Sequence, residues 1–177
     1  MSKSKKIILS AFLLALLIVL SRFASIQTQL LVISTSFIPI MMSAIWLGFK
    51  YSTVIAGLGD LIGALLFPFG SYFPGFTISA AISGFIYGIF LYENPQKGTS
   101  ERMEVYFKII VSSVLVLGVV NIFITSIWLH ILYEKAYFAI ITTRVLAQVI
   151  MLPIQVIVIY GLNKFTKPFI KKYLWED

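Results

Sequence analysis

The stretch FPFGSYFPGFTISAAISG, residues 67–84, lies between two long apolar runs and sets how the chain turns from one to the other. It contains two of the six prolines, three of the eleven glycines and five aromatic residues. Proline fixes the backbone angle φ, whereas glycine permits turns that other residues resist. A rigid, aromatic loop between two apolar segments is therefore expected here.

The composition on both sides of this loop indicates a membrane protein. Of the 177 residues, 59% are hydrophobic and 12% are charged, and the mean hydropathy is +0.97. Soluble domains carry about 25% charged residues. Apolar stretches of about 18 residues or more are typical of membrane-spanning helices. We expect one integral membrane domain over residues 1–177, an all-α bundle of six transmembrane helices.

The six predicted spans are approximately 7–25, 30–47, 52–67, 77–92, 106–132 and 139–162. The first span follows three lysines, as a signal peptide would, but it lacks an Ala-x-Ala site and leads directly into another span. It is therefore predicted to be retained.

The cations predict the orientation. Placing both termini in the cytoplasm puts eleven of the fourteen Lys and Arg residues on the inner side, as the positive-inside rule favours. These are Lys3, Lys5, Lys6, Lys50, Lys97, Arg102, Lys108, Lys164, Lys167, Lys171 and Lys172. The net charge of +7 then belongs to the inner membrane face, and a nucleic-acid partner is not required.

Apart from Lys108, which lies at the cytoplasmic end of the fifth span, the charged residues inside the predicted spans are Arg22, Asp60 and Arg144. A charge at membrane depth costs about 2.5–3.5 kcal/mol on insertion scales, so it usually faces the protein interior and marks a site. The topology places both arginines in the outer half, where two guanidinium groups would bind carboxylates. Alternatively, Arg22 extends to the outer headgroups and Arg144 pairs with Glu134.

Asp60 has two interpretations. Its carboxylate can accept hydrogen bonds from the edge of an amino-heterocycle such as an aminopyrimidine. It can equally pair with Arg22 or Arg144 and hold the bundle shut.

Polar residues line up on two predicted helices. Asn121, Thr125 and Trp128 share one face of the fifth span, and Arg144 and Gln148 share one face of the sixth. Such faces are expected to point inward, because polar groups facing lipid are costly. Gln155 continues near the second face, and for it we favour a hydrogen bond between helices.

The loop itself is too apolar to stand in water and is predicted to fold over the outer mouth of the bundle. Phe67, Phe69, Tyr72, Phe73 and Phe76 would then stack on an aromatic ligand. Alternatively, the loop is a hairpin anchored in the outer interface by its aromatic rings.

Small residues recur every four positions and predict close helix packing. These are Ala80, Gly84 and Gly88 in the fourth span, Gly59 and Gly63 in the third, and Ala11 and Ala15 in the first. The last pair is either internal or a docking face for a helix of another subunit.

Several chemistries lack support in the sequence. There is no cysteine, and the one histidine, His130, is interpreted as an interfacial or pocket-rim residue, so we expect no metal site. No HExxH, GxSxG or P-loop motif is present, which disfavours an enzyme and ATP hydrolysis by this chain. No cofactor is expected.

The chain resembles the substrate-binding S components of energy-coupling-factor (ECF) vitamin transporters, and most closely the folate-specific type. The resemblance lies in SRFASIQTQLLVISTSFIPIMMSAIWLGFKYSTVIAGLGDLIGALLFPFGSYFPGFTISAAISGFIYGIFLY, residues 21–92, and in RVLAQVIMLPIQ, residues 144–155. The element LFPFGSYFPGFTISA is fairly specific for the folate group, whereas the small-residue spacing is generic.

The resemblance implies a multi-pass protein of the prokaryotic cell membrane that captures folate outside the cell. It implies a transmembrane coupling subunit and two cytoplasmic ATPase subunits as partners, and toppling in the membrane during delivery. An Ala-xxx-Ala motif on the first helix contacts the coupling subunit in this family, and Ala11 and Ala15 match it. Arg22 and Arg144 would neutralise the glutamate tail of folate, while Asp60 or Asn121 would recognise the pterin edge.

Other functions stay open at this point. The ligand of such an S component could be another vitamin, such as a thiamine precursor. A membrane-embedded enzyme, or a membrane scaffold that binds no ligand, represents a different class of function.

Overall fold

Long apolar helices make up nearly all of the chain described by the computed structural model, which covers residues 2–27, 32–68, 71–92, 102–134 and 137–174. In chain order the elements are α1 (Lys3–Phe23), β1 (Ser25–Gln27), β2 (Val32–Ser34), α2 (Phe37–Leu47), α3 (Phe49–Leu66), α4 (Pro74–Leu91), α5 (Arg102–Val114), η1 (Leu115–Ile124), α6 (Thr125–Tyr133) and α7 (Tyr137–Leu174). The prediction of an all-α membrane bundle is confirmed, with one short hairpin of strands added to it.

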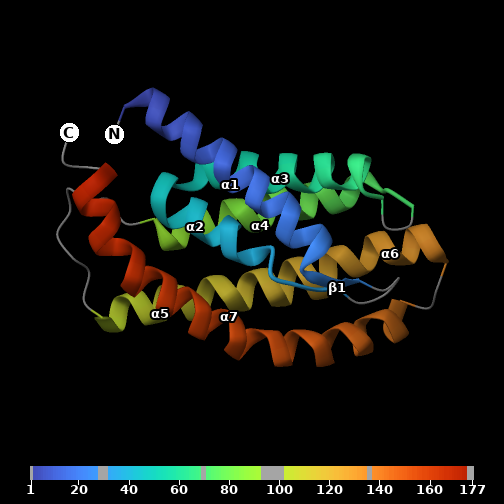
Figure 1. The fold of residues 1–177 in the computed structure, drawn as a ribbon. Helices are drawn as coiled ribbons and strands as arrows, with labels where there is room; N and C mark the ends of the chain where they lie inside the picture. Colours follow the sequence, from blue (N-terminus) through green and yellow to red (C-terminus); the bar gives the residue numbers. More distant parts are fainter. Residues whose placement is uncertain (1, 28–31, 69–70, 93–101, 135–136, 175–177) are drawn as a thin grey trace.

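The helices form two halves. Helices α1 to α4 lie on one side, and α5, η1, α6 and α7 lie on the other (Figure 1). Helix α4 contacts both halves, because it packs against α3 and α2 and also against α5 and η1. Helices α1 and α5 begin, and α7 ends, at the same end of the bundle (Figure 1). That this end faces the cytoplasm stays a prediction.

Within the described residues, five helical segments are long and apolar enough to cross a membrane. They are Lys3–Phe23, Phe49–Leu66, Pro74–Leu91, Met103–Tyr133 and Tyr137–Phe165. Large apolar side chains point outward from them: Phe138 is 82% exposed and Leu146 is 67% exposed. An outer surface of this kind is stable against lipid and would be costly in water.

The chain before α2 differs from the predicted second span, which was expected to begin near residue 30. Strand β2 pairs antiparallel with β1 there, with Ser25 opposite Ser34, and α2 has only 11 residues. Pro39 explains the late start of the helix. Proline is tolerated in the first turn, whereas in a helix interior it removes a hydrogen bond and clashes with the preceding turn. A helix that began at residue 30 would place Pro39 in its interior.

The predicted fifth span is a continuous helix made of three parts, in which the π-helix η1 joins α5 to α6. A π-helix is wider than an α-helix because each N–H bonds five residues back. Such segments occur mostly as single turns and often lie at functional sites. Apolar periodicity did not predict this segment.

Helices α3 and α4 approach each other closely through glycine. A Cβ atom on Gly84 would lie 2.4 Å from the Ser52 main-chain oxygen, and one on Gly88 would lie 2.2 Å from Phe49 Cα. The Ser52 hydroxyl donates to the Gly84 carbonyl at 2.6 Å. These contacts hold the two helices as one unit, which positions the residues of both helices around the cavity described next.

Candidate ligand-binding cavity

A cavity of about 580 Å³ lies between the two halves of the bundle. Its volume falls in the range of about 300–1,000 Å³ that is typical of small-molecule sites. Seven of the ten predicted ligand-binding residues line it: Arg22, Asp60, Tyr72, Phe76, Asn121, Arg144 and Gln148. The other three, Phe73, Trp128 and His130, are not among its lining residues.

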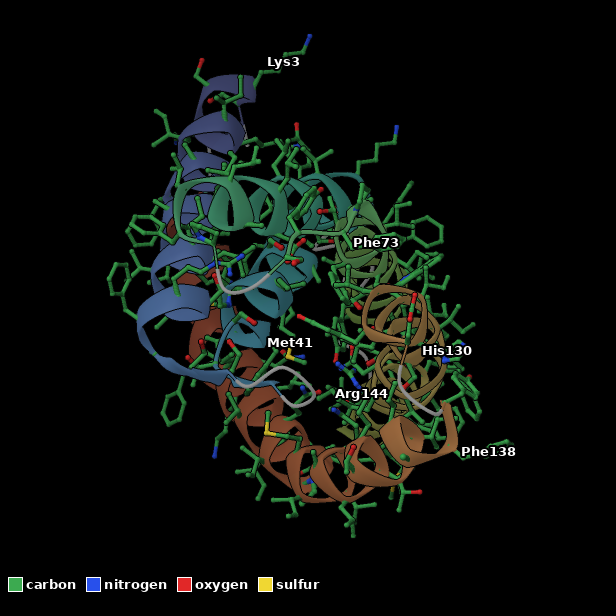
Figure 2. All side chains as sticks on the ribbon, turned by 90° about the vertical axis from the view of Figure 1, so that its right-hand side faces the viewer. Lys3, Met41, Phe73, His130, Phe138 and Arg144 are labelled. Carbon is green, nitrogen blue, oxygen red and sulfur yellow. The ribbon has the colours of Figure 1, made fainter. Side chains whose placement is uncertain are left out.

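Arg144 reaches into this cavity from α7. Its side chain points toward the space that the helices enclose when the bundle is viewed from the end where α6 and α7 meet (Figure 2). The residue is 7% exposed. Its Nη1 donates to the main-chain oxygen of Asn121 at 2.6 Å, and its Nε has no hydrogen-bond partner among the described residues. A buried cation with an unused donor is suited to hold an anionic ligand.

The π-helix supplies the carbonyl that Arg144 binds. The last hydrogen bond with π-helical spacing runs from the Thr125 N–H to the Val120 oxygen. The α-helix α6 begins at Thr125. When the spacing of the main-chain hydrogen bonds changes from five residues to four, one carbonyl is left without an N–H partner, here that of Asn121. The guanidinium group of Arg144 donates to this carbonyl in place of a main-chain N–H. The predicted pairing of Arg144 with Glu134 is not the contact that the structure records.

Arg22 lies on the opposite wall, at the end of α1. Its Nη2 lies 3.5 Å from the main-chain oxygen of Asp60, and its buried Nε has no hydrogen-bond partner within the described part of the chain. A Cβ atom on Gly63 would lie 2.8 Å from this Nε. Gly63 therefore makes room for a guanidinium group, whereas the sequence suggested only that it packs against another helix.

Asp60 is connected to the loop between α3 and α4. Its Oδ2 accepts a hydrogen bond from the Thr77 hydroxyl at 2.8 Å. The Thr77 oxygen is also 3.0 Å from the hydroxyl of Tyr72. A chain of hydrogen bonds thus runs from Tyr72 in the loop to Asp60, beside Arg22.

Two further loop aromatics pack against neighbouring helices: Phe67 contacts Phe23 of α1, with ring centroids 5.5 Å apart, and does not line the cavity, whereas Phe73 contacts α6. The rings of Phe73 and Trp128 are 5.6 Å apart, and those of Phe73 and Phe76 are 6.2 Å apart. The indole Nε1 of Trp128 donates to the Ser79 hydroxyl at 3.0 Å. Trp128 thus fixes the loop and α4 to α6, while Phe76 and Tyr72 face the cavity. Phe69 lies outside the described residues.

His130 and the small strip on α1 lie away from the cavity. His130 is exposed at the edge of the bundle (Figure 2), with its ring 6.1 Å from that of Tyr137. Ala11 and Ala15 are exposed on α1, as a docking surface requires. Within the described residues, no group of three or more His, Cys, Asp or Glu side chains is placed to hold a metal ion.

Several lining residues were not predicted to bind a ligand. Ser34 and Ser36 come from the hairpin and the turn after it, and Tyr87 and Gln155 lie deeper in the bundle. A signal for Tyr87 existed in the sequence, since Ser79, Ser83 and Tyr87 follow one another at intervals of four. The hairpin gave no comparable signal, because its residues fell within a predicted span.

The chain is similar to known transport proteins over most of its length. The family model described as "ECF-type riboflavin transporter, S component" matches residues 1–167. The folate transporter FolT of Clostridium novyi (strain NT) is 37% identical over 161 residues, which cover 91% of this chain and 89% of the relative. FolT of Leuconostoc mesenteroides is 35% identical over 164 residues, which cover 90% and 84% of the two chains.

A solved structure agrees with these matches. The crystal structure of FolT bound with folic acid superposes with a TM-score of 0.78 and 36% identity, and the match covers 90% of this chain and 91% of the other. By family match, sequence identity and fold, the chain belongs to the S components of ECF-type transporters.

Proposed function

We propose that this chain is the folate-binding subunit of an ECF transporter, and that it captures folate from the exterior for uptake powered by partner ATPase subunits. The observation that carries the proposal is the pair of arginines in the cavity. Each has a buried Nε without a hydrogen-bond partner among the described residues. Arg144 is buried, and no ion pair is recorded for it among the described residues, whereas Arg22 is half-buried beside Asp60. A buried cation without an anionic partner is costly, so a ligand that brings carboxylates into the cavity is stabilised there.

Folate has the groups that such a cavity can bind. Its glutamate tail carries two carboxylates for Arg22 and Arg144, and its rings are flat enough to lie against Phe76 and Tyr72. Its pterin presents an aminopyrimidine edge to the polar side chains of the cavity, for which Asp60, Asn121 and Gln148 are the candidates. The relatives described above are folate transporters, and the solved structure contains folic acid, which also favours folate.

Riboflavin is the second candidate, because the matching family model carries its name. Riboflavin has a flat ring system but no carboxylate. It would leave the buried guanidinium group of Arg144 without an anion, and that desolvation cost would remain. The charges of the cavity therefore favour folate over riboflavin.

Family membership and the exposed face of α1 support the partner subunits that we propose. Small residues let two helices approach closely, and Ala11 and Ala15 are exposed on one face of α1. We place the transmembrane coupling subunit on this face, with two cytoplasmic ATPase subunits bound to it. Phe73 and Trp128 act around the cavity by holding its loop, whereas His130 lies away from it.

Calorimetric titration of the purified, detergent-solubilised chain tests the proposal. Folic acid should bind tightly, and riboflavin should not compete with it. Hydrogen bonds to charged groups contribute about 1.5–3 kcal/mol each. Arg22→Met and Arg144→Met should therefore each weaken folic acid binding by about 10- to 150-fold.

Lys50→Met is the matched control, since it removes an exposed cation in the first turn of α3. It should leave folic acid affinity unchanged. Tight binding of riboflavin with no binding of folic acid would overturn the proposal, as would equal folic acid affinity in both arginine variants and the wild type.

A further inference from the structure

Each of the two long helical segments in the second half of the bundle has an irregularity near its middle. In the segment Met103–Tyr133, Gly118 lies inside the π-helix η1, and a Cβ atom there would meet nothing within 4 Å. In α7, Pro153 lies in the helix interior, where proline removes the main-chain hydrogen bond to the carbonyl of Val149. Proline and π-helical turns are two usual causes of a sharp bend in a helix, and α7 bends along its length (Figure 1). Gly118 and Pro153 are therefore the positions at which these segments can bend.

The two positions lie at the same depth in the bundle. Gly118 is 15 residues before the end of α6, and Pro153 is 16 residues after the start of α7. At 1.5 Å per residue, both lie about 22–24 Å from the connection between α6 and α7. Residues 119–133 and 137–152 thus form a pair of antiparallel helical arms, called here the α6–α7 hairpin, with one bending position at the base of each arm.

The main hydrophobic core of the described residues leaves out most of this hairpin. From the second half, the buried residues in this core are Ile109, Val116, Met151 and Ile159. Met151, two residues before Pro153, is the one that belongs to the hairpin. Other apolar residues of the hairpin are buried outside this core: Val120, Leu129, Ile140 and Ala147. The hairpin instead faces α1 to α4 across the cavity, which Arg144 lines from the hairpin and Arg22 from α1.

The helices beyond the bending positions are fixed to the rest of the bundle. The Tyr87 hydroxyl of α4 donates to Oε1 of Gln155 in α7 at 3.0 Å. The rings of Tyr106 and Tyr160 stack 4.4 Å apart and join α5 to α7. Gln155 and Tyr160 both follow Pro153, so these contacts hold the part of α7 that does not belong to the hairpin.

The hairpin itself is one unit with few restraints toward α4. Within it, Nη1 of Arg144 donates to the main-chain oxygen of Asn121 at 2.6 Å and joins α7 to η1. Toward α4 and its loop, the side-chain hydrogen bond and the ring contact recorded among the described residues both come from Trp128. Its Nε1 donates to the Ser79 hydroxyl, and its ring lies 5.6 Å from that of Phe73. One neutral hydrogen bond and one aromatic contact are weak restraints, so the hairpin can leave this position at low cost.

We propose that the α6–α7 hairpin is a gate of the cavity, which pivots about Gly118 and Pro153 and is closed by the ligand. This inference rests on the proposed function. Carboxylates bound at both Arg144, on the hairpin, and Arg22, on α1, connect the moving part to the fixed part, so the ligand shifts the equilibrium toward the closed position. Opening separates Trp128 from the loop between α3 and α4. A rigid hairpin, in which the loop alone moves, is an outcome of the test.

Distances between spin labels test the gate. The chain contains no cysteine, so the pair Leu65→Cys and Phe138→Cys, on α3 and on the hairpin, can be labelled directly, and both side chains are exposed. A change of about 20° in the bend would move the tip of an arm of about 22 Å by about 8 Å. Double electron–electron resonance in lipid nanodiscs should therefore show a shorter and narrower distance distribution for this pair after folic acid is added.

A second pair, Leu65→Cys and Phe107→Cys, is the matched control, because Phe107 is exposed on α5 before the π-helix. Its distance distribution should not change when folic acid binds.

Variants at the two bending positions test the pivot. Pro153→Ala restores a helical N–H at an exposed position, and Gly118→Ala reduces the backbone freedom of η1. Each should reduce the shift that folic acid produces in the first pair. Gly161→Ala changes α7 beyond Pro153, where an added Cβ atom meets nothing within 4 Å, and it should leave the shift as in the wild type.

A wild type that binds folic acid without a shift in the first pair would overturn the gate, as would equal shifts in both pairs. Equal shifts in the wild type, Pro153→Ala and Gly118→Ala would overturn the pivot. A wild type that fails to bind folic acid would instead refute the proposed function. If one of the two alanine variants fails to fold, the other still decides between these outcomes.

Discussion

Replacing Gly88 with alanine is predicted to destabilise the bundle, because α3 leaves no space for a side chain there. The added Cβ would lie 2.2 Å from Phe49 Cα, 2.7 Å from Phe49 N and 2.5 Å from Ser52 Oγ. The two atoms of Phe49 belong to the main chain and cannot rotate away. An ordinary contact begins at 3.4 Å, so the helices would have to separate by about 1.2 Å along this line.

The expected loss is the difference between two effects. Overpacking a close contact costs about 1–3 kcal/mol, and backbone atoms place this site at the upper end. Alanine in a helix recovers about 0.5–1 kcal/mol relative to glycine. The net loss of unfolding free energy for Gly88→Ala is therefore about 2 kcal/mol.

Gly161→Ala is the matched control on α7, because a Cβ atom there meets nothing within 4 Å. It should be neutral or stabilise the chain by up to about 1 kcal/mol. The two variants should then differ by roughly 4–12 °C in thermal unfolding midpoint, measured by circular dichroism in one detergent. Equal midpoints for the two variants would refute the close packing of α3 against α4.

Two further changes test the loop. Thr77→Val removes the hydroxyl between Tyr72 and Asp60, so folic acid should dissociate several-fold faster with little change in the association rate. Stopped-flow fluorescence measures both rates. An unchanged dissociation rate would count against a link between the loop and the cavity. Gly75→Ala places a Cβ atom 2.5 Å from Trp128 Cδ2. It should therefore lower the unfolding midpoint of the wild type but have a smaller effect in a Trp128→Leu background. If the two substitutions lower the midpoint additively, the indole is not what fills this space.

The sequence predicted the charged part of the site because charges are rare in apolar spans. Arg22, Asp60 and Arg144 were each identified by their cost in the membrane, and all three line the cavity. What surrounds each side chain was not predictable. The role of Gly63 depends on the side chain of α1 that reaches it, and helical spacing on one segment carries no information about its partner.

Local backbone geometry accounts for the other differences. The hairpin before α2 interrupts an apolar run that looked continuous, and only the position of Pro39 in its helix shows why. The π-helix is equally apolar throughout, and its register is set by the bond from Thr125 to Val120 and by the contact with Arg144. Hydropathy is insensitive to both features, since it does not record which carbonyl a donor reaches.

The central claim is that the guanidinium groups of Arg22 and Arg144 in the cavity bind the carboxylates of the ligand. The most direct measurement compares folic acid with its dimethyl ester, in which both tail carboxylates are masked, on the wild type and on Arg144→Met. The wild type should prefer folic acid, and the variant should lose most of this preference while it binds the ester as before. The account would be contradicted if the wild type binds the two ligands equally, or if the variant keeps the full preference for folic acid.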